Sequence, residues 1–221
     1  MWSLNNFELI FLLIIFIISI WIHEYAHAIT SSKFSDPSPK INGNLSLNPL
    51  KHISIIWLIP VIFINFWRWK AANINHFYYK NTVVNYIIVS FAGIIANIIL
   101  AIIWVLVLIL YWKYWIWLEH PSIINITNDV FLSLLTIFIY TNIIIATINL
   151  LPIPPLDWFR IVKFFYPQIS KYFEKYWHYL AILFFLIIIY PTSWNTIKEM
   201  ILSIWDFIYW ILFLIISNMI Y

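Results

Sequence analysis

The 221-residue chain has no cysteine, only two glycines and few charged residues. Without cysteine it has neither disulfide bonds nor thiolate metal sites, so histidine and carboxylate side chains would have to hold any transition metal. Charged residues make up 10% of the chain and hydrophobic residues 64%, whereas average proteins are nearer a quarter charged and half apolar. This balance excludes an ordinary soluble domain and indicates a protein whose main solvent is the lipid bilayer.

The net charge is +3, and no basic run is interleaved with aromatic residues. The sequence therefore gives no sign of nucleic-acid binding. The positions of the lysines and arginines are more informative than their sum, because in a membrane protein they indicate which segments face the cytoplasm.

Several apolar runs are long enough to cross about 30 Å of hydrocarbon at about 1.5 Å per residue. Four of them cover approximately residues 7–30, 82–112, 128–150 and 198–220, and a shorter fifth covers about 177–190. The first run lacks a basic start and a small-residue cleavage site, so we expect a retained helix and not a signal peptide. The sequence predicts an all-α polytopic membrane protein with about five to six transmembrane helices.

Residues 53–66 are ambiguous, because this apolar segment contains Pro60 and is short for an ordinary span. If it crosses, the basic residues divide five against seven; if it re-enters and returns, ten lie on one side and two on the other. The positive-inside rule favours the re-entrant topology. We therefore expect a multi-pass protein of the cell membrane, with the N-terminus outside, the C-terminus inside and the site near the cytoplasmic face.

Between the first helix and residue 53, the chain contains proline, glycine and asparagine around a short alternating stretch, Ile41 to Leu47. This alternation predicts a β-strand or short β-hairpin beside the site. Such backbone is tolerated at membrane depth only where protein covers it or where it lines a wet cavity.

His23, Glu24 and His27 form the pattern HEYAH within the first apolar helix. The i, i+4 spacing puts both imidazoles on one helical face, where they can share a zinc ion. Glu24 lies next to them, placed to take a proton from water. A charged side chain at the centre of a bilayer helix costs about 2.5 to 3.5 kcal/mol. The presence of three ionisable side chains there therefore favours a functional site. The alternative is an interfacial helix end where the three side chains meet water.

Asp157 is the best candidate for the third protein ligand that a catalytic zinc site requires. The other carboxylates lie in loops or at expected helix ends, and a proline-rich turn before Asp157 could bend it back toward the histidines. The alternative role is that of an N-cap for the next short helix. His27 and Asp157 reach the same membrane face only if residues 53–66 re-enter.

Asn142 and Asn149, seven positions apart on one expected helix, mark a polar face in an otherwise apolar span. Asn149 could hydrogen-bond the substrate backbone or an oxyanion. The alternative is a hydrogen bond between helices, which suits Asn142 better than Asn149.

Four segments in this order resemble the site-2 protease family of intramembrane zinc metalloproteases: HEYAH, GNLSLNPLKHI, VSFAGIIANIILA and INLLPIPPLDWFRI. The resemblance extends over residues from about 20 to 165. It implies that His23, His27 and Asp157 bind Zn2+, that Glu24 is the catalytic base, and that Asn149 belongs to a substrate-binding segment. The implied activity is that of a zinc metalloendopeptidase that cleaves transmembrane or membrane-proximal segments of protein substrates.

Three departures from the family pattern fall on glycine, proline and aspartate. Trp158 follows Asp157 where the family has Leu-Asp-Gly, and Ile94 follows Gly93 where it has Gly-Pro. The third departure is Ser54, which follows His52 and Ile53 where the family has His-Ile-Asp. A glycine beside a ligand usually means close backbone approach or positive φ, which tryptophan adopts at a cost. Trp158 therefore supports a second hypothesis, a catalytically silent or redesigned membrane protein that retains the fold.

We expect a single transmembrane domain over residues 1–221, with a catalytic core at about 7–165 and C-terminal helices at about 166–221. The expected partners are the lipid bilayer and a transmembrane protein or peptide substrate. A third hypothesis, a transporter that relays protons through histidine and glutamate, predicts a half-chain repeat that the sequence lacks.

Overall fold

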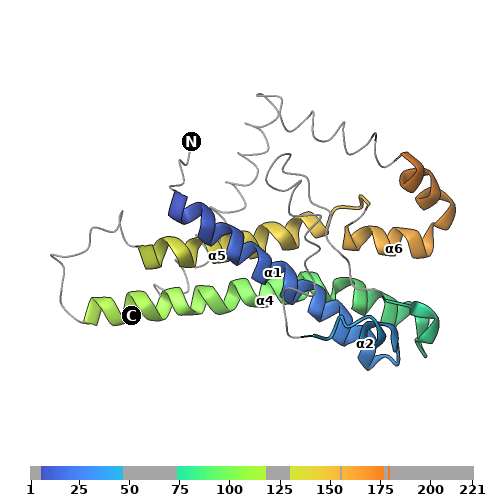
Figure 1. The fold of residues 1–221 in the computed structure, drawn as a ribbon, viewed down its shortest axis with the longest axis horizontal. Helices are drawn as coiled ribbons and strands as arrows, with labels where there is room; N and C mark the ends of the chain where they lie inside the picture. The colour runs from blue at the N-terminus through green and yellow to red at the C-terminus, as the bar shows by residue number, and fades with distance from the viewer. Residues whose placement is uncertain (1–5, 47–73, 118–129, 155, 177–178, 180–221) are drawn as a thin grey trace, which may run out of the picture. The chain divides into compact units, whose positions relative to one another are not determined.

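The computed structural model describes residues 6–46, 74–117, 130–154, 156–176 and 179. These residues form helices and turns, with no strand among them. Three helices are long: α1 (Asn6–Lys33), α4 (Thr82–Trp117) and α5 (Val130–Asn149), as Figure 1 shows. Three are short: α2 (Ser38–Ile41), the 3-10 helix η2 (His76–Tyr78) and α6 (Asp157–Phe165).

Three segments are long and apolar enough to cross a membrane: Ile10–Lys33, Thr82–Tyr111 and Val130–Asn149. They coincide with three of the predicted spans and confirm, for the part of the chain described, an all-helical fold with three helices that could cross a membrane. Large apolar side chains such as Ile99, Leu106 and Leu110 are exposed along α4, as expected of a surface in contact with lipid. The predicted spans at 177–190 and 198–220, and the segment 53–66, lie outside the described residues.

The three long helices pack on one another. α4 and α5 run antiparallel and side by side, and α1 packs against both (Figure 1). The buried positions combine small or apolar residues with polar ones, including Ala28, Val89, Ile139, Ser19, Ser90, Asn97 and Asn142. Because lipid tails are as apolar as leucine, close packing and hydrogen bonds hold such helices together, and the buried polar side chains supply the hydrogen bonds.

The predicted strand over Ile41 to Leu47 is wrong for its first six residues, and residue 47 lies outside the described part. α2 ends at Ile41, the backbone N–H of Asn42 donates to Ser38 at 3.0 Å, and the N–H of Ser46 donates to Gly43 at 3.1 Å. A proline in the first turn of α2 and the φ of 72° at Gly43 favour a helical turn followed by a tight turn. These backbone preferences outweigh the alternation of apolar side chains.

Asp36 joins the end of α1 to the chain that leads into α4. Asp36 is 1% exposed, and its carboxylate accepts hydrogen bonds from the Ser31 hydroxyl at 2.6 Å and the Asn75 N–H at 2.7 Å. The Ser38 N–H adds a bond at 2.9 Å, and the Tyr79 hydroxyl lies 2.7 Å from that of Ser31. Burial by itself raises the pKa of Asp36, but these hydrogen bonds outweigh burial and lower the pKa below its ordinary value.

The chain divides into two compact units, Met1–Tyr166 and Pro167–Tyr221. The first contains the six helices named above, and in the second residues 167–176 are helical. The boundary lies next to the expected end of the catalytic core near residue 165. The single-domain organisation stays a prediction.

Replacing Asp36 by asparagine tests the link between α1 and α4. The folded-state pKa is lowered, so the carboxylate stabilises the protein above about pH 4, and this contribution is lost as the pH falls through the folded-state pKa. We expect D36N to lower the free energy of unfolding at neutral pH by about 1–3 kcal/mol and to reduce the acid-induced loss. Thermal unfolding in detergent micelles measures both, and equal stability of parent and D36N at neutral pH would contradict this role.

Candidate metal centre

α1 carries His23 and His27 on the same face, one helical turn apart. The side chains are buried, at 4% and 0% exposed, and their rings meet edge to face with centroids 4.8 Å apart. The two Nε2 atoms lie 3.2 Å from each other. The i, i+4 spacing therefore produces the paired imidazoles that the sequence predicts.

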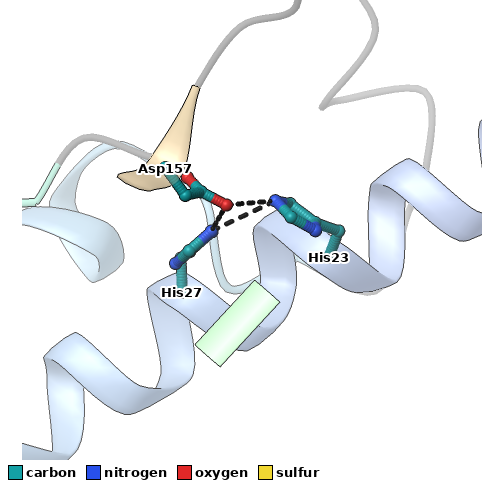
Figure 2. Close-up of side chains that lie close together, drawn as sticks. All are labelled: His23, His27 and Asp157. Atoms are coloured by element: carbon teal, nitrogen blue, oxygen red, sulfur yellow. Dashed lines mark hydrogen bonds and ion pairs between the residues drawn. The ribbon is translucent and has the colours of Figure 1, made fainter. Parts of the chain in front are cut away.

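Asp157, the first residue of α6, lies against both histidines (Figure 2). Its Oδ2 is 2.8 Å from Nε2 of His23 and 2.9 Å from Nε2 of His27. The N-cap of α6 is Leu156, so the alternative role of Asp157 as an N-cap is wrong. The structure thus brings together three side chains whose ligand atoms lie within 4.8 Å of one another. We call His23, His27 and Asp157 the metal centre.

The carboxyl group of Asp157 is held in its ionised form. Burial by itself raises its pKa, but His27, His23 and Arg160 outweigh burial and hold the pKa well below the usual range. Arg160 contributes from one turn further along α6, with Nε 3.4 Å from Oδ1 of Asp157. The two oxygens of Asp157 therefore face different partners, Oδ1 the arginine and Oδ2 the histidines.

The Nδ1 atoms of both histidines face oxygen acceptors on α4. Nδ1 of His27 lies 2.7 Å from the carbonyl oxygen of Val89, and Nδ1 of His23 lies 2.8 Å from Oδ1 of Asn97. Because a carbonyl oxygen only accepts, each Nδ1 donates its hydrogen, and in the neutral imidazole that a metal ligand must be, the lone pair lies on Nε2. Both lone pairs then lie beside the carboxylate of Asp157.

The metal centre fits a zinc ion. Two imidazole nitrogens and one carboxylate oxygen are ligands that catalytic zinc takes, at about 2.0–2.2 Å, and ligands around a tetrahedral ion of this size lie roughly 3.3 Å apart. The separations of 2.8, 2.9 and 3.2 Å are close to this value. Two lone pairs and a carboxylate oxygen repel one another at such distances unless a cation or protons lie among them.

The backbone of α4 closes one side of the metal centre at Gly93. A Cβ atom at this position would lie 2.6 Å from Cε1 and Nε2 of His23 and closer still to Nε2 of His27. Only glycine leaves room for both imidazoles there. The motif that contains Gly93 was part of the family resemblance, but the sequence alone assigned it no role.

Glu24 follows His23 in α1 and is buried, with 7% of its surface exposed. Asn149 is the last residue of α5, is partly buried, and donates from Nδ2 to the carbonyl oxygen of Ile145 at 2.9 Å. Among the hydrogen bonds of the described residues, none joins Asn149 to the metal centre. Because one of its N–H groups donates to Ile145, the amide is oriented with its oxygen away from that carbonyl, where the oxygen can accept from a further partner.

Trp158 is the second residue of α6, and its ring packs edge to face on Phe91 of α4 with centroids 5.4 Å apart. Ser35 is the one non-glycine residue with positive φ in the described ranges. Trp158 therefore adopts ordinary helical backbone, without the positive φ that a glycine at this place would permit.

Two residues around the metal centre, Asn97 and Arg160, were not predicted. Asn97 is 0% exposed and lies in the middle of an apolar span, where a polar side chain is costly unless it has a partner. That cost is the signal in the sequence that could have identified it. Arg160 follows Asp157 by three positions in a short helix, a spacing that allows contact but does not require it.

The chain is similar to one protein family and to two named relatives. The model of peptidase family M50 matches residues 11–191. The chain is 35% identical over 153 residues to "Putative zinc metalloprotease YwhC" of Bacillus subtilis, which covers 69% of this chain and 68% of the relative. It is 29% identical over 187 residues to "Putative zinc metalloprotease Rip2" of Mycolicibacterium smegmatis, covering 80% of this chain and 68% of the relative. No solved structure matches.

Substituting the two glycines separates metal binding from backbone strain. G93A places a methyl group against both imidazoles, so we expect loss of zinc binding, although alanine favours a helix over glycine by about 1 kcal/mol. G43A is the matched control, because nothing lies within 4 Å of its added Cβ and its φ of 72° costs stability alone. Zinc content of the purified variants is the measurement; zinc retained by G93A at the parent level would contradict the geometry.

Proposed function

Because the chain belongs to peptidase family M50, the site-2 protease family, we propose that it is a zinc metalloendopeptidase that cleaves transmembrane or membrane-proximal segments of protein substrates. The observation that carries this proposal is the convergence of His23, His27 and Asp157, beside Glu24, among apolar helices that can cross a membrane. The names of the two relatives support the assignment to zinc and to peptide hydrolysis.

The residues of the metal centre have distinct roles in this proposal. Nε2 of His23, Nε2 of His27 and Oδ2 of Asp157 would hold the zinc ion. Zinc supplies Lewis-acid chemistry when bound: it polarises the scissile carbonyl and makes water more acidic. Glu24 would accept the proton of the attacking water and pass it to the leaving amine, so one carboxylate serves first as base and then as acid.

Asn149 would bind the substrate backbone. The N–H groups of a regular helix are engaged within that helix, so a scissile segment has to unwind before its carbonyl can be attacked, and its freed N–H groups then need acceptors in the membrane. The oxygen of Asn149 is one such acceptor, because its amide nitrogen already bonds Ile145.

We propose a multi-pass protein of the cell membrane with its active site near the cytoplasmic face. The distribution of lysine and arginine supports this orientation. A second support is the contact between Asp36, just after α1, and Asn75, just before α4. The end of α1 and the start of α4 therefore lie side by side, as the re-entrant topology requires.

A cleavage assay in proteoliposomes tests the mechanism with a reporter that has a single transmembrane helix interrupted near its middle by Asn-Pro. We expect E24Q to keep about one zinc per chain and to lose cleavage by about 10²–10⁴-fold, because proton transfer is lost while the ligands remain. D157A should lose both zinc and cleavage. Equal cleavage by the parent, E24Q and D157A would contradict the proposed mechanism.

The same assay addresses the alternative of a catalytically silent protein that retains the fold, which the tryptophan after Asp157 motivates. Zinc bound at one per chain without cleavage of the reporter by the parent would favour this alternative. Gain of cleavage in W158G would then assign the silence to the indole ring.

A further inference from the structure

We propose that Asn97 is a positioning residue for His23, and that Asn142 in turn holds Asn97. Their hydrogen bonds fix which nitrogen of His23 carries the hydrogen and where the ring points, so that Nε2 faces the metal centre. This inference rests on the proposed function, since it assigns the two asparagines a role in metal binding.

The three side chains form a hydrogen-bonded chain across three helices, α1, α4 and α5. Nδ1 of His23 lies 2.8 Å from Oδ1 of Asn97, Nδ2 of Asn97 lies 3.0 Å from Oδ1 of Asn142, and Nδ2 of Asn142 lies 2.9 Å from the carbonyl oxygen of Phe138. Both asparagines are 0% exposed. At this degree of burial, little water can replace any of these partners.

The backbone carbonyl at the far end sets the direction of every hydrogen bond in the chain. The oxygen of Phe138 can only accept, so Asn142 turns its NH2 group toward Phe138 and its oxygen toward Asn97. Asn97 must then donate to that oxygen, which turns its own oxygen toward His23. A reversed amide at either position would bring two oxygens or two NH2 groups together.

The consequence is that Nδ1 of His23 is a donor and Nε2 carries the lone pair. His27 reaches the same state by a different route, because its Nδ1 faces the backbone carbonyl of Val89. One ligand is thus positioned by main chain and the other by a side chain. Only the second arrangement can be removed by substitution, which makes it testable.

Structural packing alone is the competing explanation, since asparagines also hold transmembrane helices together. Packing predicts a loss of stability when Asn97 is removed, with unchanged affinity for zinc among molecules that remain folded. Positioning predicts a loss of affinity, because outer hydrogen-bond partners of ligating histidines typically contribute about 10–100-fold to metal affinity.

The test measures zinc affinity of full-length variants in detergent by competition with a chelator, together with the visible spectrum after cobalt(II) substitution. We expect N97L to bind zinc about 10–100-fold more weakly and to show an altered cobalt spectrum. N97D should keep an affinity near that of the parent, because a carboxyl oxygen at this position still accepts from Nδ1 of His23. T141V is the matched control, since Thr141 is buried beside Asn142 on α5 but is not part of the hydrogen-bonded chain of His23, Asn97 and Asn142.

N142L is the second variant, and it serves alone if N97L does not fold. It keeps Asn97 and removes the group that orients it, so a fall in affinity of about threefold or more supports the proposal. Parent-like zinc affinity and cobalt spectrum in a folded N97L, or in N142L where N97L does not fold, would overturn it. Absence of zinc from the parent would instead contradict the proposed function.

Discussion

Each histidine of the metal centre has two ring nitrogens, and among apolar helices both need a partner from the protein or an ion. Oxygen acceptors on α4 take the Nδ1 hydrogens, and this leaves two Nε2 atoms and the carboxylate of Asp157 within 3.2 Å of one another. An unsatisfied polar group in hydrocarbon costs several kcal/mol. The positions of α1, α4 and α6 are therefore coupled through this one set of contacts.

α4 contributes to the site through residues spaced four apart. Val89, Gly93 and Asn97 share one face of the helix, where they supply a carbonyl acceptor, the space for two imidazoles and an amide acceptor. Asp36 adds a constraint at the helix ends by joining the end of α1 to Asn75 before α4. The close approach of α1 and α4 thus depends on small and polar residues and not on a large apolar core.

Features with a local cause were predictable from the sequence. The three described spans follow from the length of their apolar runs, and the pairing of His23 and His27 follows from helical spacing. The strand over Ile41 to Leu47 was mispredicted because proline and glycine determine the backbone there more strongly than alternation does. Asn97 was not predicted because its partners lie on other helices. Arg160 was not predicted because its contact depends on the exact orientation of Asp157.

The proposed function requires that His23, His27 and Asp157 together hold one zinc ion. X-ray absorption at the zinc edge of the purified, zinc-loaded protein tests it most directly. We expect two imidazole nitrogens and oxygen ligands at about 2.0–2.2 Å from the zinc ion, with one imidazole lost in H23A. A zinc environment with fewer than two imidazoles in the parent, or one that H23A leaves unchanged, would contradict it.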